Sequence, residues 1–151
     1  MNLQTVNIGS VQTSAPRSPC HHVIGSHGEV WQWYGDGRDL ITRIVAVRRP
    51  CMPSATAVRH LLIAEMRRIS DEFDDDPTDT EVCVSQVRGS QAAFHATSSG
   101  ITSGIRLHNA VLMATDGSSL YLSRVVSPDT ADGRGLAEAM HSNIQFSRRA
   151  G

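Results

Sequence analysis

Cysteine and histidine are concentrated in one short segment, at Cys20, His21, His22 and His27. Thiolate sulfur and imidazole nitrogen are ligands that Zn²⁺ prefers, and four such groups on one loop can surround an ion. The spacing matches no Cys-x-x-Cys zinc-finger pattern. Two interpretations stay open: a zinc site formed by these four side chains, or solvent-exposed side chains on a histidine-containing loop.

A second group combines two tryptophans with two histidines. Trp31 and Trp33 share one face of a predicted strand, because strand side chains alternate. His95 and His108 lie in two later predicted strands. If the sheet and the long helix enclose a pocket, as in a small-ligand-binding or enzymatic domain, these four residues are its candidate lining for a ligand or partner. The alternative is that the tryptophans are core residues and the histidines are ordinary sheet residues.

No catalytic residue is predicted. Ser98-Ser99-Gly100 and Gly117-Ser118-Ser119 do not form the G-x-S-x-G pattern of a nucleophile elbow. All fourteen cationic residues are arginine, which excludes a lysine nucleophile or Schiff base. The glycines form no phosphate-binding loop with a helix start and lysine. The chain is therefore more consistent with a binding protein than with an enzyme.

Seven acidic residues fall between Asp71 and Glu81. Such oxygen-rich segments can bind Ca²⁺, but the glycine and glutamate positions of an EF-hand are missing here. We expect a solvated acidic loop, which would also suit docking of a basic partner.

Composition limits the remaining classes. The 151 residues carry a formal net charge of −1, so no global basic field attracts nucleic acid. Three widely spaced cysteines form no disulfide framework, and the N-terminal residues lack the pattern of a signal peptide. No apolar run is long enough to span a bilayer. We expect a cytoplasmic protein without a membrane span, and no cofactor unless the histidine segment binds zinc.

The hydrophobic pattern predicts strands separated once by a long helix. Apolar residues at three- and four-residue steps indicate a helix from Ser54 to about Phe73. A Gly-Asp-Gly turn joins two of the strands as a hairpin, and a short helix is expected at 132–141. The expected strands are 3–13, 29–34, 40–48, 81–88, 91–97, 105–114, 119–126 and a short edge at 143–146.

This order is typical of an α+β fold: an antiparallel β-sheet flanked by one long and one short helix. We expect one domain over residues 1–151, with a flexible loop at about 14–28 and a tail at 147–151. Edge strands of such a sheet can also pair two copies of the chain as a homodimer.

The stretch from Glu81 to Phe146 resembles the PsbP-like α/β/α sandwich superfamily, which includes DcrB-type and actinobacterial LpqN-type proteins. The resemblance rests on the turn at Arg88-Gly89-Ser90, the strand IRLHNAVLM, the turn at Asp116-Gly117 that leads to Leu120-Tyr121-Leu122-Ser123, and a short helix before Ser142. It implies a sandwich fold and a non-enzymatic accessory role in which the protein binds a protein partner. It carries over no catalytic residue.

Overall fold

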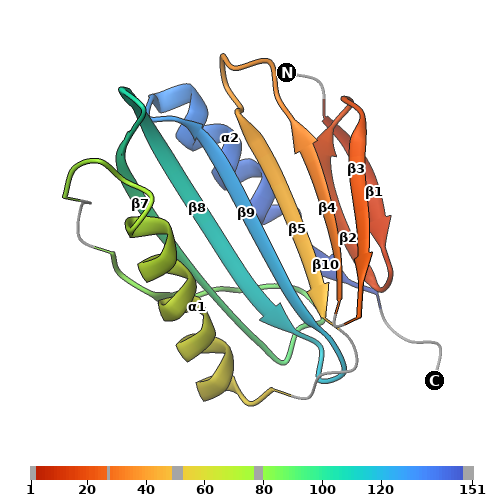
Figure 1. Ribbon diagram of the computed structural model, residues 1–151. Helices are drawn as coiled ribbons and strands as arrows, with labels where there is room; N and C mark the ends of the chain where they lie inside the picture. Colours follow the sequence, from red (N-terminus) through yellow and green to blue (C-terminus); the bar gives the residue numbers. More distant parts are fainter. Residues whose placement is uncertain (1–2, 27, 49–52, 77–79, 148–151) are drawn as a thin grey trace.

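Two antiparallel sheets and two helices form the computed structural model, which describes residues 3–26, 28–48, 53–76 and 80–147 (Figure 1). The larger sheet has seven strands in the order β3-β4-β5-β9-β8-β7-β6, and the smaller sheet has the order β1-β2-β10. The strands are β1 Leu3–Ile8, β2 Val11–Pro16, β3 Cys20–Gly25, β4 Gly28–Tyr34, β5 Thr42–Arg48, β6 Cys83–Val84, β7 Ala92–Thr102, β8 Ile105–Thr115, β9 Leu120–Pro128 and β10 Gln145–Phe146, and the helices are α1 Ala55–Ser70 and α2 Ala131–Ser142.

The layers give the predicted α+β arrangement. Helix α1 packs on β7 and β8 from one face of the larger sheet. Helix α2 and the smaller sheet lie on the opposite face (Figure 1). The two faces of one sheet therefore carry two separate sets of packing partners.

The N-terminal region differs most from the prediction. The expected strand 3–13 is a hairpin of β1 and β2, which turns at Gly9 with a positive φ of 59°. The expected flexible loop at 14–28 is wrong, because β2 continues to Pro16 and Cys20–Gly25 forms β3, paired with β4. Serine, histidine and cysteine are weak strand signals, but pairing with a strong neighbouring strand overrides local preference.

Helix α1 has the start and stripe that the sequence predicts. The Ser54 hydroxyl accepts a hydrogen bond from the Ala57 amide at 3.1 Å, which caps the N-terminus. The helix ends at Ser70, three residues before the expected end. Its inward stripe is fully buried and consists of Val58, Leu62, Met66 and Ile69.

The acidic segment after α1 is tied to the β7–β8 turn. That turn has positive φ at Ser103 and Gly104, 52° and 80°. The Asp74 carboxylate accepts from the Ser103 amide at 2.8 Å, and the Asp75 carboxylate accepts from the Ile101 amide at 2.7 Å. Part of the predicted acidic loop therefore stabilises a hairpin end, since its carboxylates satisfy backbone donors there.

Helix α2 approaches the sheet closely at a glycine. The Thr130 hydroxyl caps the helix by accepting from the Gly133 amide at 3.0 Å. A Cβ atom on Gly133 would lie 2.4 Å from the Pro128 carbonyl oxygen. This close approach requires glycine, so a side chain here would displace the helix.

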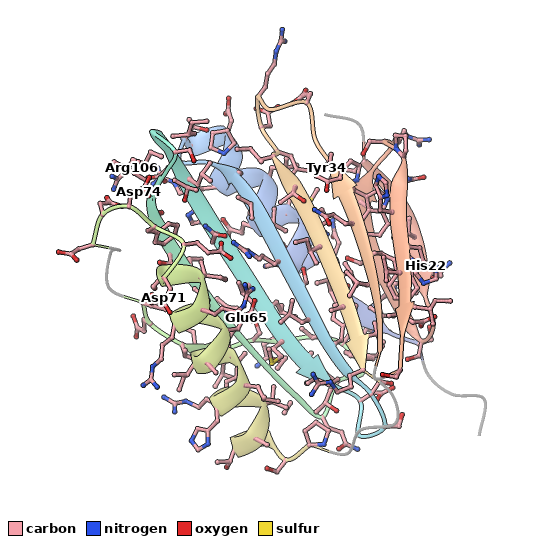
Figure 2. The ribbon with its side chains drawn as sticks, viewed as in Figure 1. His22, Tyr34, Glu65, Asp71, Asp74 and Arg106 are labelled. Carbon is pink, nitrogen blue, oxygen red and sulfur yellow. The ribbon has the colours of Figure 1, made fainter. Side chains whose placement is uncertain are left out.

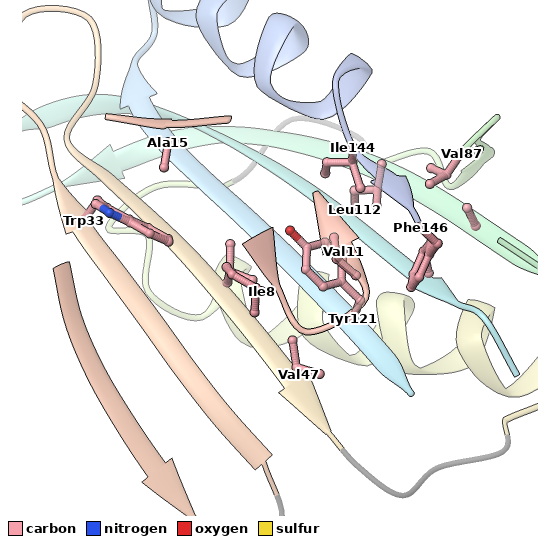
Figure 3. Packing of buried hydrophobic residues seen from close by; sticks show 13 residues of the cluster. Ile8, Val11, Ala15, Trp33, Val47, Val87, Leu112, Tyr121, Ile144 and Phe146 are labelled. Carbon is pink, nitrogen blue, oxygen red and sulfur yellow. The ribbon is translucent and has the colours of Figure 1, made fainter. Parts of the chain in front are cut away.

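The main core lies between the larger and the smaller sheet (Figure 3). The rings of Tyr121 and Phe146 meet edge to face, with centroids 6.1 Å apart. Trp33 is buried in this core and belongs to the face that the smaller sheet covers. Helix α1 covers a second core on the opposite face, so it does not pack against the tryptophans.

Candidate functional site

The two helices leave part of each sheet face open. Beside α1, the strands β4, β5 and β9 form the floor of a groove of about 600 Å³. Beside α2, the strands β7 and β8 form the floor of a cavity of about 430 Å³. The outer edge of β3 is a third open feature, and it lies at one end of the sheet (Figure 1).

Every residue of the edge strand β3 is exposed. Val23 and Ile24 retain 64% and 72% of their accessible surface, although both are large and apolar. Because β3 is the terminal strand of the larger sheet and β4 is its one partner among the described strands, half of its backbone donors and acceptors point away from the sheet. Unpaired edges of this kind are templates for an additional strand.

Two of the predicted zinc ligands, Cys20 and His22, lie on the same face of the β3–β4 hairpin as the two predicted tryptophans. Cys20 pairs with Trp33, and His22 pairs with Trp31. The His22 and Trp31 rings are stacked, with centroids 4.3 Å apart and planes 11° apart. The His22 imidazole also lies 3.6 Å from the Glu29 carboxylate. Figure 2 shows His22 at the outer side of the sheet.

Zinc binding at this hairpin stays a prediction. His21 lies on the opposite face from Cys20 and His22, and its ring contacts Tyr34 edge to face at 6.0 Å. His27 lies outside the described residues. Partial burial raises the pKa of the Cys20 thiol, which disfavours the thiolate that a metal needs. Within the described ranges, no three His, Cys, Asp or Glu side chains are arranged to hold one ion.

The groove beside α1 is predominantly apolar. Helix α1 contributes Leu61, which is 38% exposed, and Ala64. The end of the β3–β4 hairpin forms one wall, so the groove begins close to the exposed edge strand. Glu65 and Arg68 form an ion pair at its rim. The sheet contributes Val30, Ala46, Leu120 and Leu122 to the lining.

The cavity beside α2 contains three histidines. His95 from β7 and His108 from β8 line it together, and His141 from α2 is the third. Trp31 and Trp33 do not line this cavity. The structure therefore brings together the two predicted histidines but separates them from the two predicted tryptophans.

Each of the three histidines contacts a serine. The Ser85 hydroxyl lies 2.8 Å from Nδ1 of His95. The Ser99 hydroxyl lies 3.2 Å from Nδ1 of His108, and the Ser123 hydroxyl lies 2.7 Å from Nε2 of His141. The three serines come from different parts of the larger sheet: Ser85 follows β6, Ser99 lies in β7, and Ser123 lies in β9.

Burial keeps two of these imidazoles neutral. It lowers the pKa of His108, although the nearby Asp129 carboxylate opposes this effect. Burial holds the pKa of His141 well below its usual value of 6.5, and the positive charge of Arg43 adds to this shift. Neutral imidazole has one N–H donor and one acceptor nitrogen, so each ring can accept from serine on one side and donate on the other.

Behind His141 lies a buried arginine. Arg43 is completely inaccessible to solvent, and its guanidinium donates hydrogen bonds to the hydroxyls of Ser123 and Thr13, the latter at 2.7 Å. Among the described residues, none of the ion pairs includes Arg43. Burial lowers its pKa, but arginine stays charged in proteins. A charge without a carboxylate partner therefore lies within the core.

Sequence reasoning missed Arg43, Ser123 and His141. One signal was present, because alternation in the strand places Arg43 on the same face as the buried Val45 and Val47. A charged residue in a run of inward-facing positions indicates a buried charge that needs partners.

No helix in the described part of the chain has the length and apolar character needed to cross a membrane. Neither a protein-family model nor a curated protein matches the chain. A solved structure of a mutant of the protein Mog1 superimposes with a TM-score of 0.57 at 10% identity, over 99% of this chain and 98% of that one. The solution structure of cyanobacterial PsbP (CyanoP) from Synechocystis sp. PCC 6803 gives 0.52 at 11% identity, over 95% and 92%.

At such low identities the likeness shows the fold alone. Both superpositions extend over nearly the whole chain, including the N-terminal half that the sequence resemblance did not cover. The PsbP-like fold predicted from residues 81–146 is thereby confirmed.

Proposed function

We propose that the protein is a non-enzymatic binding module that holds an extended segment of a protein partner along the outer edge of β3. The observation that supports this proposal is the exposure of all six residues of β3, with Val23 and Ile24 among them. Addition of a partner strand would pair the free backbone groups of this edge. The resemblance to PsbP-like proteins, which implies an accessory role, points in the same direction.

The two faces of β3 would select different features of the partner. Val23 faces the side of the sheet that carries the apolar groove, since it pairs with the groove residue Val30. Ile24 faces the side that carries His22 and Trp31. A partner segment with alternating side chains would place apolar residues toward the groove and an aromatic or polar residue toward the His22–Trp31 stack.

The test compares two lysine substitutions at exposed isoleucines. Ile24→Lys places a charge on the edge strand, whereas Ile105→Lys places the same charge at the start of β8, where Ile105 is 55% exposed. Both variants should keep the stability of the parent within about 0.5 kcal/mol, because the side chains are on the surface. Proteins retained from a cell lysate by the immobilised parent chain are then titrated against both variants.

We expect Ile24→Lys to weaken binding about tenfold or more, because lysine on an edge opposes strand addition. Ile105→Lys should bind as the parent does. Amide hydrogen exchange in the complex should slow at β3 and leave β6, the opposite edge, unchanged. Equal binding by both variants, or protection confined to other strands, would contradict the proposed edge.

A second copy of the chain is the alternative occupant of this edge. Two β3 strands paired across a twofold axis would join two seven-stranded sheets into one. Light scattering at increasing protein concentration distinguishes the two cases, since a homodimer that Ile24→Lys dissociates would make the edge a self-association site. If the chain stays monomeric at all concentrations, the β3 edge is available to a different protein.

A further inference from the structure

We propose that the cavity beside α2 binds a small organic carboxylate. This site is separate from the β3 edge, because its floor is formed by β7 and β8 at the other end of the larger sheet. Its volume of about 430 Å³ falls in the range of small-molecule pockets.

The charge near the cavity favours an anion. Arg134 and Glu138 lie one turn apart on α2, line the cavity and offset one another. Asp129, close to His108, is already paired with both Arg106 and Arg134, at 3.0 Å and 3.3 Å. The buried Arg43 has no such carboxylate among the described residues, so its charge remains uncompensated. An anion in the cavity would offset part of the free-energy penalty of that buried charge.

A chain of hydrogen bonds connects Arg43 to the cavity wall. The guanidinium can only donate, so it occupies a lone pair of the Ser123 hydroxyl. That hydroxyl is then free to donate its proton to Nε2 of His141. In the neutral ring this arrangement leaves the proton on Nδ1. The positive charge thus polarises an imidazole that lines the cavity.

The other two histidines supply donors of the same kind. Each uses Nδ1 for a serine hydroxyl, and a serine that donates there leaves the ring proton on Nε2. Thr97 and Gln86 add a hydroxyl and an amide to the lining. Several N–H and O–H donors together suit a carboxylate, which accepts through both oxygens.

The rest of the lining is small and apolar, which suits a short hydrocarbon group attached to the carboxylate. Ala110 and Leu112 of β8 form part of the floor, and Ala137 of α2 forms part of the wall. Burying such a group contributes roughly 25 cal/mol for each Å² removed from water. We therefore expect affinity to rise from acetate to butyrate and hexanoate.

The experiment follows the histidine ring nitrogens of the ¹⁵N-labelled full chain by NMR at neutral pH. Acetate, butyrate, hexanoate and benzoate are titrated beside the matched neutral amides, butyramide, hexanamide and benzamide. We expect saturable shifts at His95, His108 and His141 with the carboxylates, increasing in affinity with chain length. The ring of His60, exposed on α1, should not move.

Variants at His95 distinguish the effect of its hydrogen-bond donor from the effect of its ring shape. His95→Phe removes the donor and keeps a ring, and should weaken carboxylate binding about tenfold or more, as expected for one hydrogen bond to a charged group. His95→Gln keeps an N–H donor and should retain most of the affinity. The proposal is overturned if no carboxylate binds saturably, if the amides bind equally well, or if His95→Phe binds as the parent does.

Discussion

The groove beside α1 and the cavity beside α2 have the same origin but opposite linings. Each lies where a helix covers only part of a sheet face. One strand contributes to both sides: Leu122 of β9 lines the groove, whereas the next residue, Ser123, faces the other way and holds His141. A step of one residue therefore separates an apolar surface from a hydrogen-bonded one.

Because of this difference, binding in the groove and binding in the cavity would depend on different interactions. Binding in the groove would depend on burial of apolar area, which responds little to pH or to moderate salt. Binding in the cavity would depend on the protonation of His108 and His141 and on the buried Arg43 charge. Solution conditions can therefore distinguish the two sites before any partner is known.

The largest expected effect is the loss of stability when a core residue of α1 is truncated, compared with truncation of the neighbouring groove residue. Leu62→Ala removes a completely buried side chain of α1 and should lower the free energy of unfolding by about 2–5 kcal/mol. Leu61→Ala, at the adjacent groove position, should lower it by less than about 1 kcal/mol, because Leu61 is partly exposed already. Urea denaturation of both variants measures these changes in the free energy of unfolding. Similar losses would show that the groove is closed in solution.

The next test moves the helix that forms the cavity wall. Gly133→Ala should destabilise the fold by about 1–3 kcal/mol, because the new methyl group would collide with the Pro128 carbonyl. Gly135→Ala is the matched control on the same helix, where a Cβ atom meets nothing within 4 Å. It should stabilise the helix by up to about 1 kcal/mol, owing to better helix propensity. If α2 packs on the sheet as described, thermal unfolding should give a lower Tm for Gly133→Ala and a higher Tm for Gly135→Ala than for the parent.

The smallest expected effect concerns pH. The pKa of His141 is lowered in the folded chain, so the unfolded chain binds one more proton below pH 6.5. Stability should therefore be complete above this pH and fall as pH decreases below it, by at most about 1.4 kcal/mol per pH unit for one group. His108, with its pKa also lowered, contributes in the same direction. Denaturation at pH 7.5, 6.5 and 5.5 measures the slope.

His141→Gln removes this titration and keeps a hydrogen-bonding group for Ser123. Its slope between pH 6.5 and 5.5 should be smaller than that of the parent. An unaltered slope in the His141 variant would contradict the lowered pKa, because it would mean that this ring binds protons equally in the folded and unfolded chains.

Sequence patterns predicted those elements whose residues agree at several levels. Ser54 with the spaced apolar residues after it marked α1, and the β-branched run ending at Arg48 marked β5. The Gly-Asp-Gly and Asp116-Gly117 turns marked two hairpins, and both pairs are antiparallel. Local propensity, periodicity and turn chemistry point the same way in these segments.

The prediction was wrong where pairing decides the structure. Strand β3 has a composition typical of loops. It forms a strand because its backbone pairs with that of β4. The expected strand 81–88 shrinks to Cys83–Val84, since this segment pairs with β7 over only two residues. The candidate cavity was half predicted: alternation indicated His95 and His108, but the position of α2 over the sheet, which brings His141 to them, depends on tertiary packing.

The smaller sheet joins strands that are far apart in the sequence, and this determines which parts of the core can form first during synthesis. Strand β2 pairs with β1 along its whole length and with β10 at Val11 and Gln12, and Arg88 bridges to Gln145 of β10. During synthesis the β1–β2 hairpin emerges before β10, and a two-stranded hairpin alone is marginally stable in water. The apolar face of this hairpin is not fully covered until Ile144 and Phe146 have been synthesised, because both residues belong to the same core. The nascent chain would therefore expose Val11 and Trp33 until residues 144–146 have been synthesised, which makes this segment a candidate for chaperone contact.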